Sequence, residues 1–428
     1  MIKKVLIHGP ILTRTGYGEM ARLALKSLLK FPDRFDVYIN NITWGIHPSW
    51  IIEPELRDLV DSLLYKTASY IKTGGGFDIS IQCTIPNEFK RMADYNIGYT
   101  AGIEATKVHP KWIVACEQMD KIITISSFSK SVFEETVAEV YNQAGQEFQL
   151  KLSKPIDYVS FPVKTLKKID IDNFEPTTSI NFLVVAQDGP RKNVDNTIRW
   201  FLDTFQDDPN VGLVLKITYL NSSTMDEYHM RKKIGMICAS YPSKKCKLYY
   251  ISGNLKDEEM NCLYQHPTMY ALINLSHGEG YGLPMFEASY NGLPVITCGW
   301  SGQLDFLTFD KEKITTKPNG KKKKETIRKT CFAEVDFSID NVPEECTSNE
   351  IYVGESKWCN PNKVSFCNMI KKFVNTRAKY QSKSEELRDH LLKEFTEDKI
   401  CEKFADLVCS KASYDIDSWL DSMNVEDV

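Results

Sequence analysis

The sequence predicts an α/β protein made of two successive Rossmann-like, doubly wound domains. Three observations lead to this fold class. Short β-branched runs alternate with longer stretches whose apolar residues recur at helical spacing, as in parallel βαβ units. The alternation stops at a polar, charged segment from 163 to 179 and then starts again. At 428 residues, the chain is also too long for a single hydrophobic core.

The elements of the first half form a predicted domain over residues 1–172. Its strands are expected at 5–8, 35–39, 79–83, 96–100 and 121–125, and its helices at 19–29 and from Pro110 and Ser129. The second predicted domain, 173–412, repeats the arrangement. Its strands are expected at 181–186, 212–218, 247–251, 270–275 and 294–297, and its helices at 193–205 and 284–290. An irregular, Lys-rich insertion near 310–360 precedes further helices, and residues 413–428 form a last segment that can return to the first domain.

Composition and charge are those of an ordinary soluble protein. Hydrophobic residues make up 42% and charged residues 26% of the chain, and a net charge of -4 gives no overall attraction to a polyanion. The twelve cysteines include no CxxC pair, so we expect free thiols, as in a reducing compartment. No apolar run is long enough for a signal peptide or a membrane span. We therefore expect a cytoplasmic location, with peripheral membrane contact left open.

The segment from 276 to 288 carries the clearest chemistry. It follows an apolar strand, and Pro284 suits the first turn of a helix. Gly280 and Gly282 lack a Cβ atom, so the backbone amides of this loop can approach a phosphate closely. The partial positive charge of the helix N-terminus adds to the attraction at the same point. The sequence therefore predicts a phosphate-binding loop that consists of Gly280, Tyr281, Gly282 and Leu283.

Two glutamates of the same segment are placed to accept hydrogen bonds from sugar hydroxyls. Glu279 lies on the predicted loop, and Glu287 lies in the first turn of the predicted helix, where its carboxylate can hold both hydroxyls of a ribose. A glycine turn with two surface glutamates is the alternative interpretation. The combination of strand, glycine loop, Pro-started helix and two acids favours a binding site.

A group of cations follows the first strand of the second half. Arg191 and Lys192 stand beside a helix start, where Arg191 can bind a diphosphate with its forked guanidinium and Lys192 as a point charge. Lys216, at the end of the next strand, is a third candidate. An isolated Arg-Lys pair is usually solvated. Three cations at strand ends of the domain that carries the glycine loop favour a phosphate site instead.

On these residues the chain resembles the family 4 glycosyltransferases, a group with the GT-B fold. The resemblance covers roughly residues 1–310. Its motifs are the runs 189–193, 279–287 and 297–302 in the second half, and 104–106, Trp112 and 119–126 in the first half. One position departs from the family, because many members have an arginine five residues before the phosphate lysine, where this chain has Gln187.

The resemblance implies two domains that face each other across a cleft and a reaction between them. The reaction is transfer of a sugar from a UDP- or GDP-sugar to a hydroxyl, with retained anomeric configuration and without a metal or other cofactor. The catalytic residues would be Glu279, Lys192 and Arg191, with Glu279 facing the donor sugar. Glu287 would face the ribose.

The first half contains a second glycine loop, in which Gly16 and Gly18 fit the pattern G-x-G-x-x-A at a helix start. In a transferase, this loop would close over the donor phosphates. The alternative is the dinucleotide fingerprint of an NAD(P)-dependent oxidoreductase. Against it, the loop from 9 to 15 is long for the required tight turn, and the next strand ends on Asn40 and Asn41 instead of an acid. A non-catalytic subunit that binds nucleotide sugars is a further alternative.

The acceptor is the least specified part of the prediction. Glu104 and His109 could border the cleft on the acceptor side, although a lone histidine is as often structural. A glycan, a lipid and a hydroxylated nucleobase in DNA all remain open as acceptors. Between Lys311 and Lys329 the chain holds eight lysines and one arginine, including the run 321–324. We interpret this stretch as a solvated loop, and contact with an anionic acceptor is the alternative.

Overall fold

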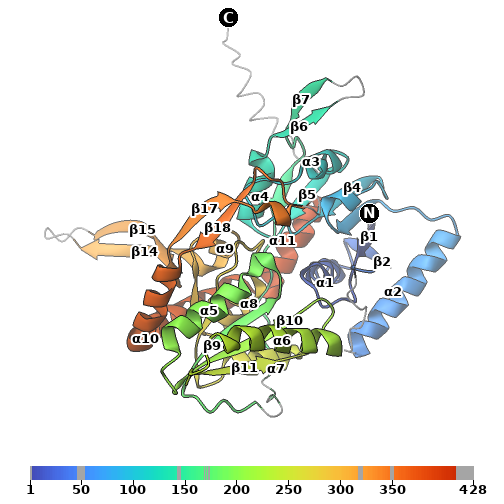
Figure 1. Ribbon diagram of the computed structural model, residues 1–428. Helices are drawn as coiled ribbons and strands as arrows, with labels where there is room; N and C mark the ends of the chain where they lie inside the picture. The colour runs from blue at the N-terminus through green and yellow to red at the C-terminus, as the bar shows by residue number, and fades with distance from the viewer. Residues whose placement is uncertain are drawn as a thin grey trace, which may run out of the picture.

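Two six-stranded parallel sheets form the framework of the protein (Figure 1). The computed structural model describes residues 2–45, 54–141, 146–167, 169, 171, 174–316, 322–347 and 351–410. The first sheet has the order β2-β1-β3-β4-β5-β8. Its strands are β1 (Lys3–Gly9), β2 (Phe35–Asn41), β3 (Ile79–Cys83), β4 (Tyr95–Tyr99), β5 (Lys121–Thr124) and β8 (Ile156–Tyr158). The accompanying helices are α1 (Gly16–Leu29), α2 (Pro54–Lys72), α3 (Pro110–Glu117) and α4 (Ser127–Glu135), and β6 (Ala138–Tyr141) pairs with β7 (Glu147–Leu150) in a separate hairpin.

The second sheet repeats this arrangement with the order β11-β10-β9-β12-β13-β16. Its strands are β9 (Ile180–Gln187), β10 (Val211–Thr218), β11 (Lys247–Ile251), β12 (Met269–Asn274), β13 (Val295–Cys298) and β16 (Ala333–Val335). Its helices are α5 (Val194–Phe205), α6 (Thr224–Ala239), α7 (Asp257–Tyr264), α8 (Leu283–Tyr290) and α9 (Leu304–Leu307). The predicted fold class, two Rossmann-like α/β units, is confirmed.

The strands pair in parallel because they are apolar on both faces. Seven of the eight residues of β10 are buried, and β3 is buried throughout. A parallel sheet with helices on both faces requires this kind of strand. The helices begin where the sequence offers a cap, as at α1, where the Thr15 hydroxyl accepts the Gly18 N–H at 3.1 Å. In such sheets the loops at the carboxyl ends of the strands form the ligand site.

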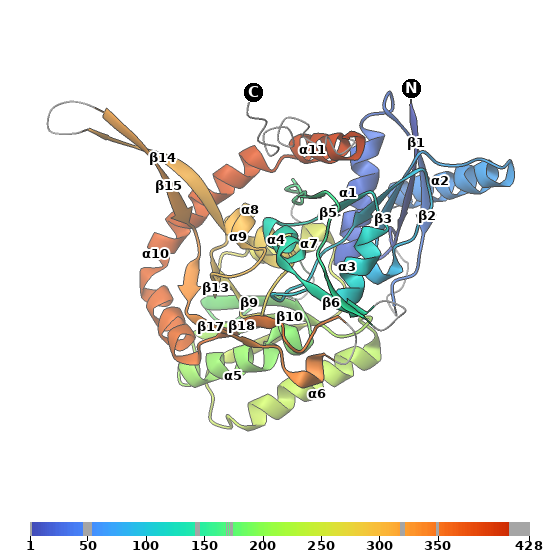
Figure 2. The ribbon, with the colours of Figure 1, turned by 90° about the horizontal axis from the view of Figure 1, so that it is seen from above.

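The Lys-rich stretch is more regular than predicted. Instead of an irregular insertion, β14 (Thr308–Thr316) and β15 (Lys322–Thr330) form an antiparallel hairpin, which projects from the body of the protein (Figures 1 and 2). After β16, the strands β17 (Phe337–Asn341) and β18 (Lys357–Pro361) form a second hairpin. The prediction missed these strands because their β-branched and aromatic residues are interspersed with lysines and acids, which hide the strand pattern.

Two C-terminal helices connect the halves of the protein. α10 (Lys363–Glu394) leaves helical geometry at Thr376 and buries residues of both halves of its length. α11 (Glu397–Cys409) then lies beside α1, with ion pairs from Lys30 to Asp398 at 2.6 Å and from Arg34 to Asp406 at 2.9 Å (Figure 2). The boundaries at 172 and 412 stay a prediction, and residues 413–428 lie outside the described part of the chain.

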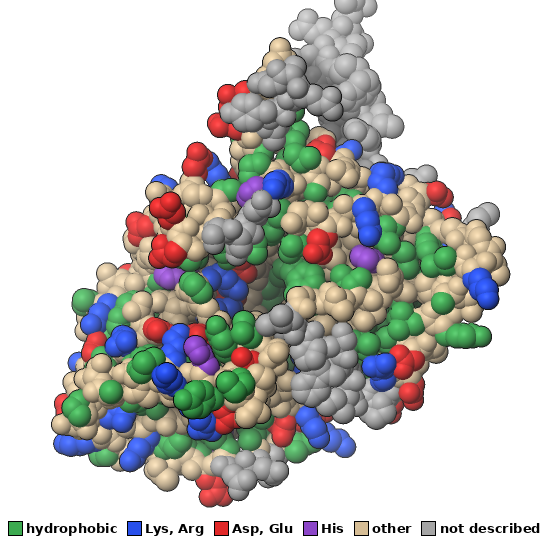
Figure 3. All heavy atoms as spheres, turned by 45° about the vertical axis from the view of Figure 1, so that its right-hand side comes forward, with side chains coloured by type: hydrophobic (Ala, Val, Ile, Leu, Met, Phe, Trp, Pro, Cys, Tyr) green, Lys and Arg blue, Asp and Glu red, His purple; other side chains and the backbone are tan. Residues whose placement is uncertain are grey.

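Charged side chains of both signs are interspersed over the face shown in Figure 3, with a hollow near its centre that has basic and hydrophobic side chains at its edge. Among the described residues, no helix combines the length and the apolar character needed to cross a bilayer.

Candidate active site

The loop between β12 and α8 ends in a left-handed residue and contains amides without a hydrogen-bond acceptor. Gly282 has a φ of +96°, a conformation that a residue with a Cβ atom adopts only under strain, and it directly precedes Leu283, the first residue of α8. Gly280, Tyr281 and Gly282 are buried, yet within the described residues no acceptor takes their N–H groups. Because buried amides are nearly always paired, three such groups at a helix N-terminus indicate a site for an anion.

This loop lies directly against the first half of the protein. A Cβ atom at Gly280 would lie 2.9 Å from the Ala101 carbonyl oxygen, and one at Gly278 would lie 2.5 Å from the Glu104 carbonyl oxygen. The Tyr281 side chain points into the core, where it packs against Phe161, Phe286 and Phe306. Only the backbone of Tyr281 is therefore available to a ligand, as the phosphate-loop prediction requires.

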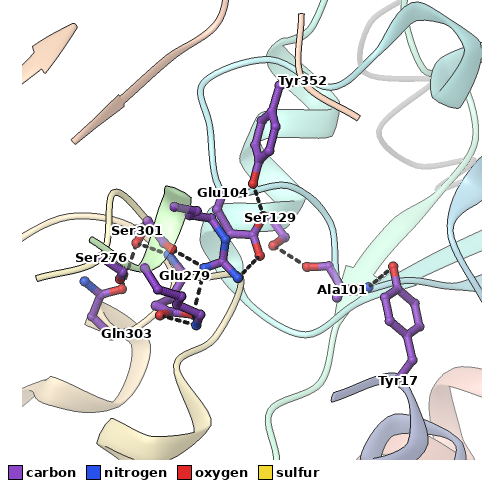
Figure 4. A network of polar contacts seen from close by, with 12 residues as sticks. Tyr17, Ala101, Glu104, Ser129, Ser276, Glu279, Ser301, Gln303 and Tyr352 are labelled. Carbon is purple, nitrogen blue, oxygen red and sulfur yellow. Dashed lines mark hydrogen bonds and ion pairs between the residues drawn. The ribbon is translucent and has the colours of Figure 1, made fainter. Parts of the chain in front are cut away.

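Glu279 is the centre of a buried cluster of charges (Figure 4). Its carboxylate accepts hydrogen bonds from Lys192 Nζ at 2.7 and 2.9 Å, from Arg191 Nη1 at 3.1 Å and from Asn274 Nδ2 at 3.3 Å. The Glu279 N–H donates to Ser301 Oγ at 3.0 Å. Three predicted catalytic residues thus meet at one point, which lies beside the unpaired amides of the loop.

The cluster keeps its carboxylate ionised. Burial raises the pKa of Glu279, but Lys192 and Arg191 outweigh it and hold the pKa at about 2. Burial lowers the pKa of Lys192 below its ordinary value, and the neighbouring Arg191 lowers it further. Two cations and one carboxylate therefore share this buried space.

Glu104 reaches the same cluster from the first half of the protein. Its Oε1 lies 3.2 Å from Arg191 Nη2, and its Oε2 accepts a hydrogen bond from the Tyr352 hydroxyl at 3.0 Å (Figure 4). Arg191 also donates to the Gly278 carbonyl oxygen at 2.6 Å. The Arg191 guanidinium is thus shared between two carboxylates and a carbonyl, on both sides of the interface between the halves.

Glu287 belongs to a second, half-buried group. The Tyr264 hydroxyl donates to Glu287 Oε2 at 2.8 Å, and Lys164 nearby pairs with Glu19 at 3.3 Å and with Asp257 at 2.8 Å. Burial raises the pKa of Glu287 to about 7, although Lys164 and Tyr264 oppose the shift. The two predicted sugar-binding glutamates therefore lie in different surroundings, one ionised and one near its titration point.

Four other predicted residues have different surroundings. The Lys216 ammonium donates to the Gly253 carbonyl oxygen at 2.6 Å, and burial lowers its pKa to about 8. Gly16 is exposed at the start of α1, whereas Gly18 is buried and closely packed. His109 Nδ1 accepts the Lys111 N–H at the N-terminus of α3, and its acceptor-side role stays a prediction. The donor-site roles of Lys216, Gly16 and Gly18 stay predictions.

Two residues that complete these groups carry no signal in the sequence. Tyr352 contacts Glu104 over a separation of 248 residues, and Lys164 comes from the connecting segment between the sheets. Polar residues near a motif can be identified from the sequence, but partners from distant segments cannot. Within the described ranges, no group of three or more His, Cys, Asp or Glu side chains is arranged to hold a metal ion.

Comparison with known proteins gives the fold its name. No protein-family model matches the sequence, and no curated protein matches it. The chain is similar in structure to sucrose-phosphate synthase from Thermosynechococcus elongatus, with a TM-score of 0.58, 12% identity and coverage of 95% of this chain and 98% of that chain. It is similar to OtsA in the apo form, with a TM-score of 0.56, 10% identity and coverage of 95% and 99%. HepE from Anabaena in complex with UDP-glucose has a TM-score of 0.55, 12% identity and coverage of 95% and 99%. The chain has the GT-B fold that these proteins share.

Proposed function

We propose that this chain, with its GT-B fold, transfers a sugar from a nucleoside diphosphate sugar to a hydroxyl group. The observation that carries the proposal is the buried pair of Lys192 and Glu279 beside the unpaired amides of Gly280, Tyr281 and Gly282. A cation, a helix N-terminus and a carboxylate suit a diphosphate that is linked to a sugar. HepE, which has the same fold, holds UDP-glucose in its solved structure.

In this proposal, Lys192 and the loop amides bind the diphosphate of the donor. Negative charge grows on the diphosphate as its bond to the sugar breaks. Fixed donors in a buried site stabilise that charge without reorganisation. Arg191, which is hydrogen bonded to Glu279, adds a second positive charge near the diphosphate. With these two cations, no divalent ion is needed to stabilise the leaving group.

The two glutamates bind the two sugar rings of the donor, which are the transferred sugar and the ribose. Glu279, which is ionised, accepts hydrogen bonds from hydroxyls of the transferred sugar. Glu287, on the first turns of α8, holds the ribose hydroxyls. The base is that of UDP or GDP, and Lys216, Gly16 and Gly18 are further donor-side residues.

The proposed reaction retains the configuration at the anomeric carbon. The acceptor oxygen bonds to this carbon on the face from which the diphosphate leaves, while the bond to the diphosphate oxygen breaks. The acceptor proton passes to that departing oxygen. Glu104 is placed on the acceptor side, and the acceptor is a glycan, a lipid or a hydroxylated nucleobase.

Turnover tests the proposal. Purified protein is incubated with UDP- and GDP-sugars and candidate acceptors, with and without EDTA. The release of nucleoside diphosphate is measured, and NMR identifies the anomer of the product. We expect release with one donor class, a product with the donor's configuration and no loss in EDTA. An inverted product would contradict retention, and loss restored by a divalent ion would contradict the metal-free reaction.

Two alternatives receive less support. An NAD(P)-dependent oxidoreductase would use the loop with Gly16 and Gly18, but the structural relatives do not favour it. A non-catalytic binding subunit would retain the donor site without turnover. Binding of a nucleotide sugar without release of product, over all acceptors, would favour that subunit.

A further inference from the structure

A segment of the second half crosses to the first half beside the candidate site. This segment, here called the strap, consists of residues 342–347 and 351–361 and includes β18. Val342 and Trp358 of the strap are buried in one hydrophobic cluster with Trp112 and Ile113 of α3. The strap is thus anchored in the first half of the protein, although the chain enters it from β17 and leaves it into α10.

β18 is hydrogen bonded to the loops on both sides of the candidate site. The Lys357 N–H donates to Thr106 Oγ1 at 2.8 Å, and the Thr106 N–H donates to the Lys357 carbonyl at 2.8 Å. Two residues further on, the Cys359 N–H donates to the His277 carbonyl at 2.9 Å. The ring of His277 also stacks on Trp358, with 4.4 Å between centroids. The strap therefore holds the loop with Glu104 against the loop with Glu279.

Tyr352 of the strap is hydrogen bonded to the charged cluster of Glu104, Arg191 and Glu279. Its hydroxyl donates to Glu104 Oε2 at 3.0 Å, while Glu104 Oε1 faces Arg191 at 3.2 Å. Arg191 in turn reaches Glu279 Oε2 at 3.1 Å. Figure 4 labels Tyr352, Glu104 and Glu279, which lie along this path from the strap to the donor loop.

The Tyr352 hydroxyl acts as a hydrogen-bond donor that fixes the orientation of the Glu104 carboxylate. Burial, with the charge of Glu104 next, raises the pKa of Tyr352 above its ordinary value, so its hydroxyl is a protonated donor at neutral pH. Each oxygen of Glu104 then has a partner. Without the hydroxyl, Glu104 Oε2 would lose its partner and the carboxylate could rotate away from Arg191. Arg191 would then pair with Glu279 alone, and the Glu279 carboxylate would shift toward the guanidinium.

We propose that Tyr352 is a positioning residue for sugar transfer, which orients the Glu279 carboxylate through Glu104 and Arg191. The inference rests on the proposed function, because the orientation of Glu279 matters to the reaction only if Glu279 faces the donor sugar. Tyr352 itself need not touch either substrate.

Tyr352→Phe removes the hydroxyl and keeps the ring. We expect kcat to fall about tenfold, the loss of roughly one hydrogen bond to a charged group, while donor affinity in calorimetry changes less than about twofold. Glu104→Gln should lower kcat at least as much. In the double variant, Tyr352→Phe should add nothing to Glu104→Gln, because both changes act on the same contact.

A matched control separates this effect from a general loosening of the strap. Lys107→Ala breaks an exposed ion pair of 2.9 Å between Glu355 of the strap and the loop that carries Glu104. This variant should keep the kcat of the wild type, since neither residue touches the charged cluster. Equal losses of kcat in Lys107→Ala and Tyr352→Phe would mean that the strap only holds the halves together.

Two further outcomes would overturn the inference. One is an unchanged kcat in Tyr352→Phe, and the other is a double variant in which the two losses multiply. Donor binding by the wild-type protein is measured first, so that its absence is recognised as a failure of the proposed function. Thermal unfolding of the wild-type protein, Tyr352→Phe, Glu104→Gln and the double variant measures the coupling energy between Tyr352 and Glu104 without a donor.

Discussion

At the scale of residues, stability and donor binding both depend on how the charges of the site are paired. Glu279 is buried and pairs with the half-buried Lys192, and a buried carboxylate that loses its partner destabilises the folded protein. A diphosphate that enters beside them gives Lys192 a second anionic partner. The same pair can therefore stabilise the protein without ligand and bind the donor with it.

Lys192→Gln should keep a donor for Glu279 but lose the positive charge. We expect kcat to fall about 100-fold and the Michaelis constant for the donor to change much less, because the charge on the diphosphate grows toward the transition state. Steady-state kinetics measure both constants, and a melting curve shows whether the variant is folded. A change confined to the Michaelis constant would make Lys192 a binding residue only.

Glu287 should give donor binding a pH dependence. Its pKa is about 7 in the folded protein against an ordinary 4.5, so the folded state binds more protons between these values. Its contribution to stability is therefore full below about 4.5 and is lost as the pH rises toward 7. The carboxylate is the better acceptor for ribose hydroxyls, so donor affinity should increase as the pH rises through 7.

Glu287→Gln should remove both trends and weaken donor binding roughly fivefold at high pH, since a neutral amide replaces a charged acceptor. Calorimetry across this pH range measures the affinity. A variant that retains the wild-type pH dependence would assign the titration to another group and remove the ribose role from Glu287.

The same residues show what a sequence can reveal about a site. Lys192, Glu279 and Glu287 stand at strand ends and helix starts, so their motifs were recognisable. The sequence predicts Arg191 on the diphosphate, and this role stays a prediction. In the structure its guanidinium contacts Glu104, Glu279 and the Gly278 carbonyl oxygen. This sharing depends on a contact between the two halves, which leaves no local pattern in the sequence.

At the scale of elements, the two glycines at the start of α1 have different surroundings. A Cβ atom at Gly18 would lie 2.1 Å from the Thr13 carbonyl oxygen, whereas one at Gly16 would meet no atom within 4 Å. Gly18 is thus needed for the loop to pack against the helix, and Gly16 is free to face a ligand.

Gly18→Ala should lower the free energy of unfolding by roughly 1–3 kcal/mol, because backbone must move to admit the methyl group. Gly16→Ala is the matched control and should leave the free energy of unfolding unchanged. Denaturant unfolding measures both variants. Equal stabilities would mean that the loop relaxes without cost. Weaker donor binding by Gly16→Ala alone would support its place at the phosphates.

The hairpin of β14 and β15 divides into two parts by charge. Near its base, Arg328 pairs with Asp310 at 3.3 Å and Lys311 pairs with Glu386 at 2.8 Å. From 313 to 324 the sequence has six lysines and no acid. Lys324 pairs with Glu312, and Lys321 lies outside the described residues. The pattern agrees with solvated charges that are neutralised where the hairpin joins the body.

Replacement of all four residues of the run 321–324 by serine should leave both Michaelis constants unchanged at every salt concentration. A solvated hairpin is screened over about 8 Å at physiological ionic strength and would not act on the distant donor site. Kinetics with each active acceptor at low and high salt test this expectation. If the variant instead has a higher Michaelis constant for the acceptor at low salt, and this difference from the wild type disappears at high salt, the acceptor is anionic, such as a phosphate-bearing lipid or nucleic acid.

At the scale of the whole molecule, several contacts join the two halves of the protein. The strap, α11 and the hydrogen bond from the Ser127 N–H to Asp305 at 2.7 Å each link segments that lie far apart in the chain. The alternation of strands and helices predicted both sheets, because each strand carries its own pattern. The links were not predictable, since they pair residues far apart in the chain. Contact between the halves would exclude water from the donor during transfer.

Calorimetric titration with UDP-sugars, GDP-sugars and NAD shows whether the protein binds a nucleotide sugar at the proposed donor site. The titrations use the wild-type protein, Lys192→Gln and Glu287→Gln, all shown to be folded by their melting curves. We expect that the wild-type protein binds one class of nucleotide sugar, that both variants bind it more weakly, and that NAD does not bind. Binding of NAD without any nucleotide sugar, or donor affinity unchanged in both variants, would contradict this expectation.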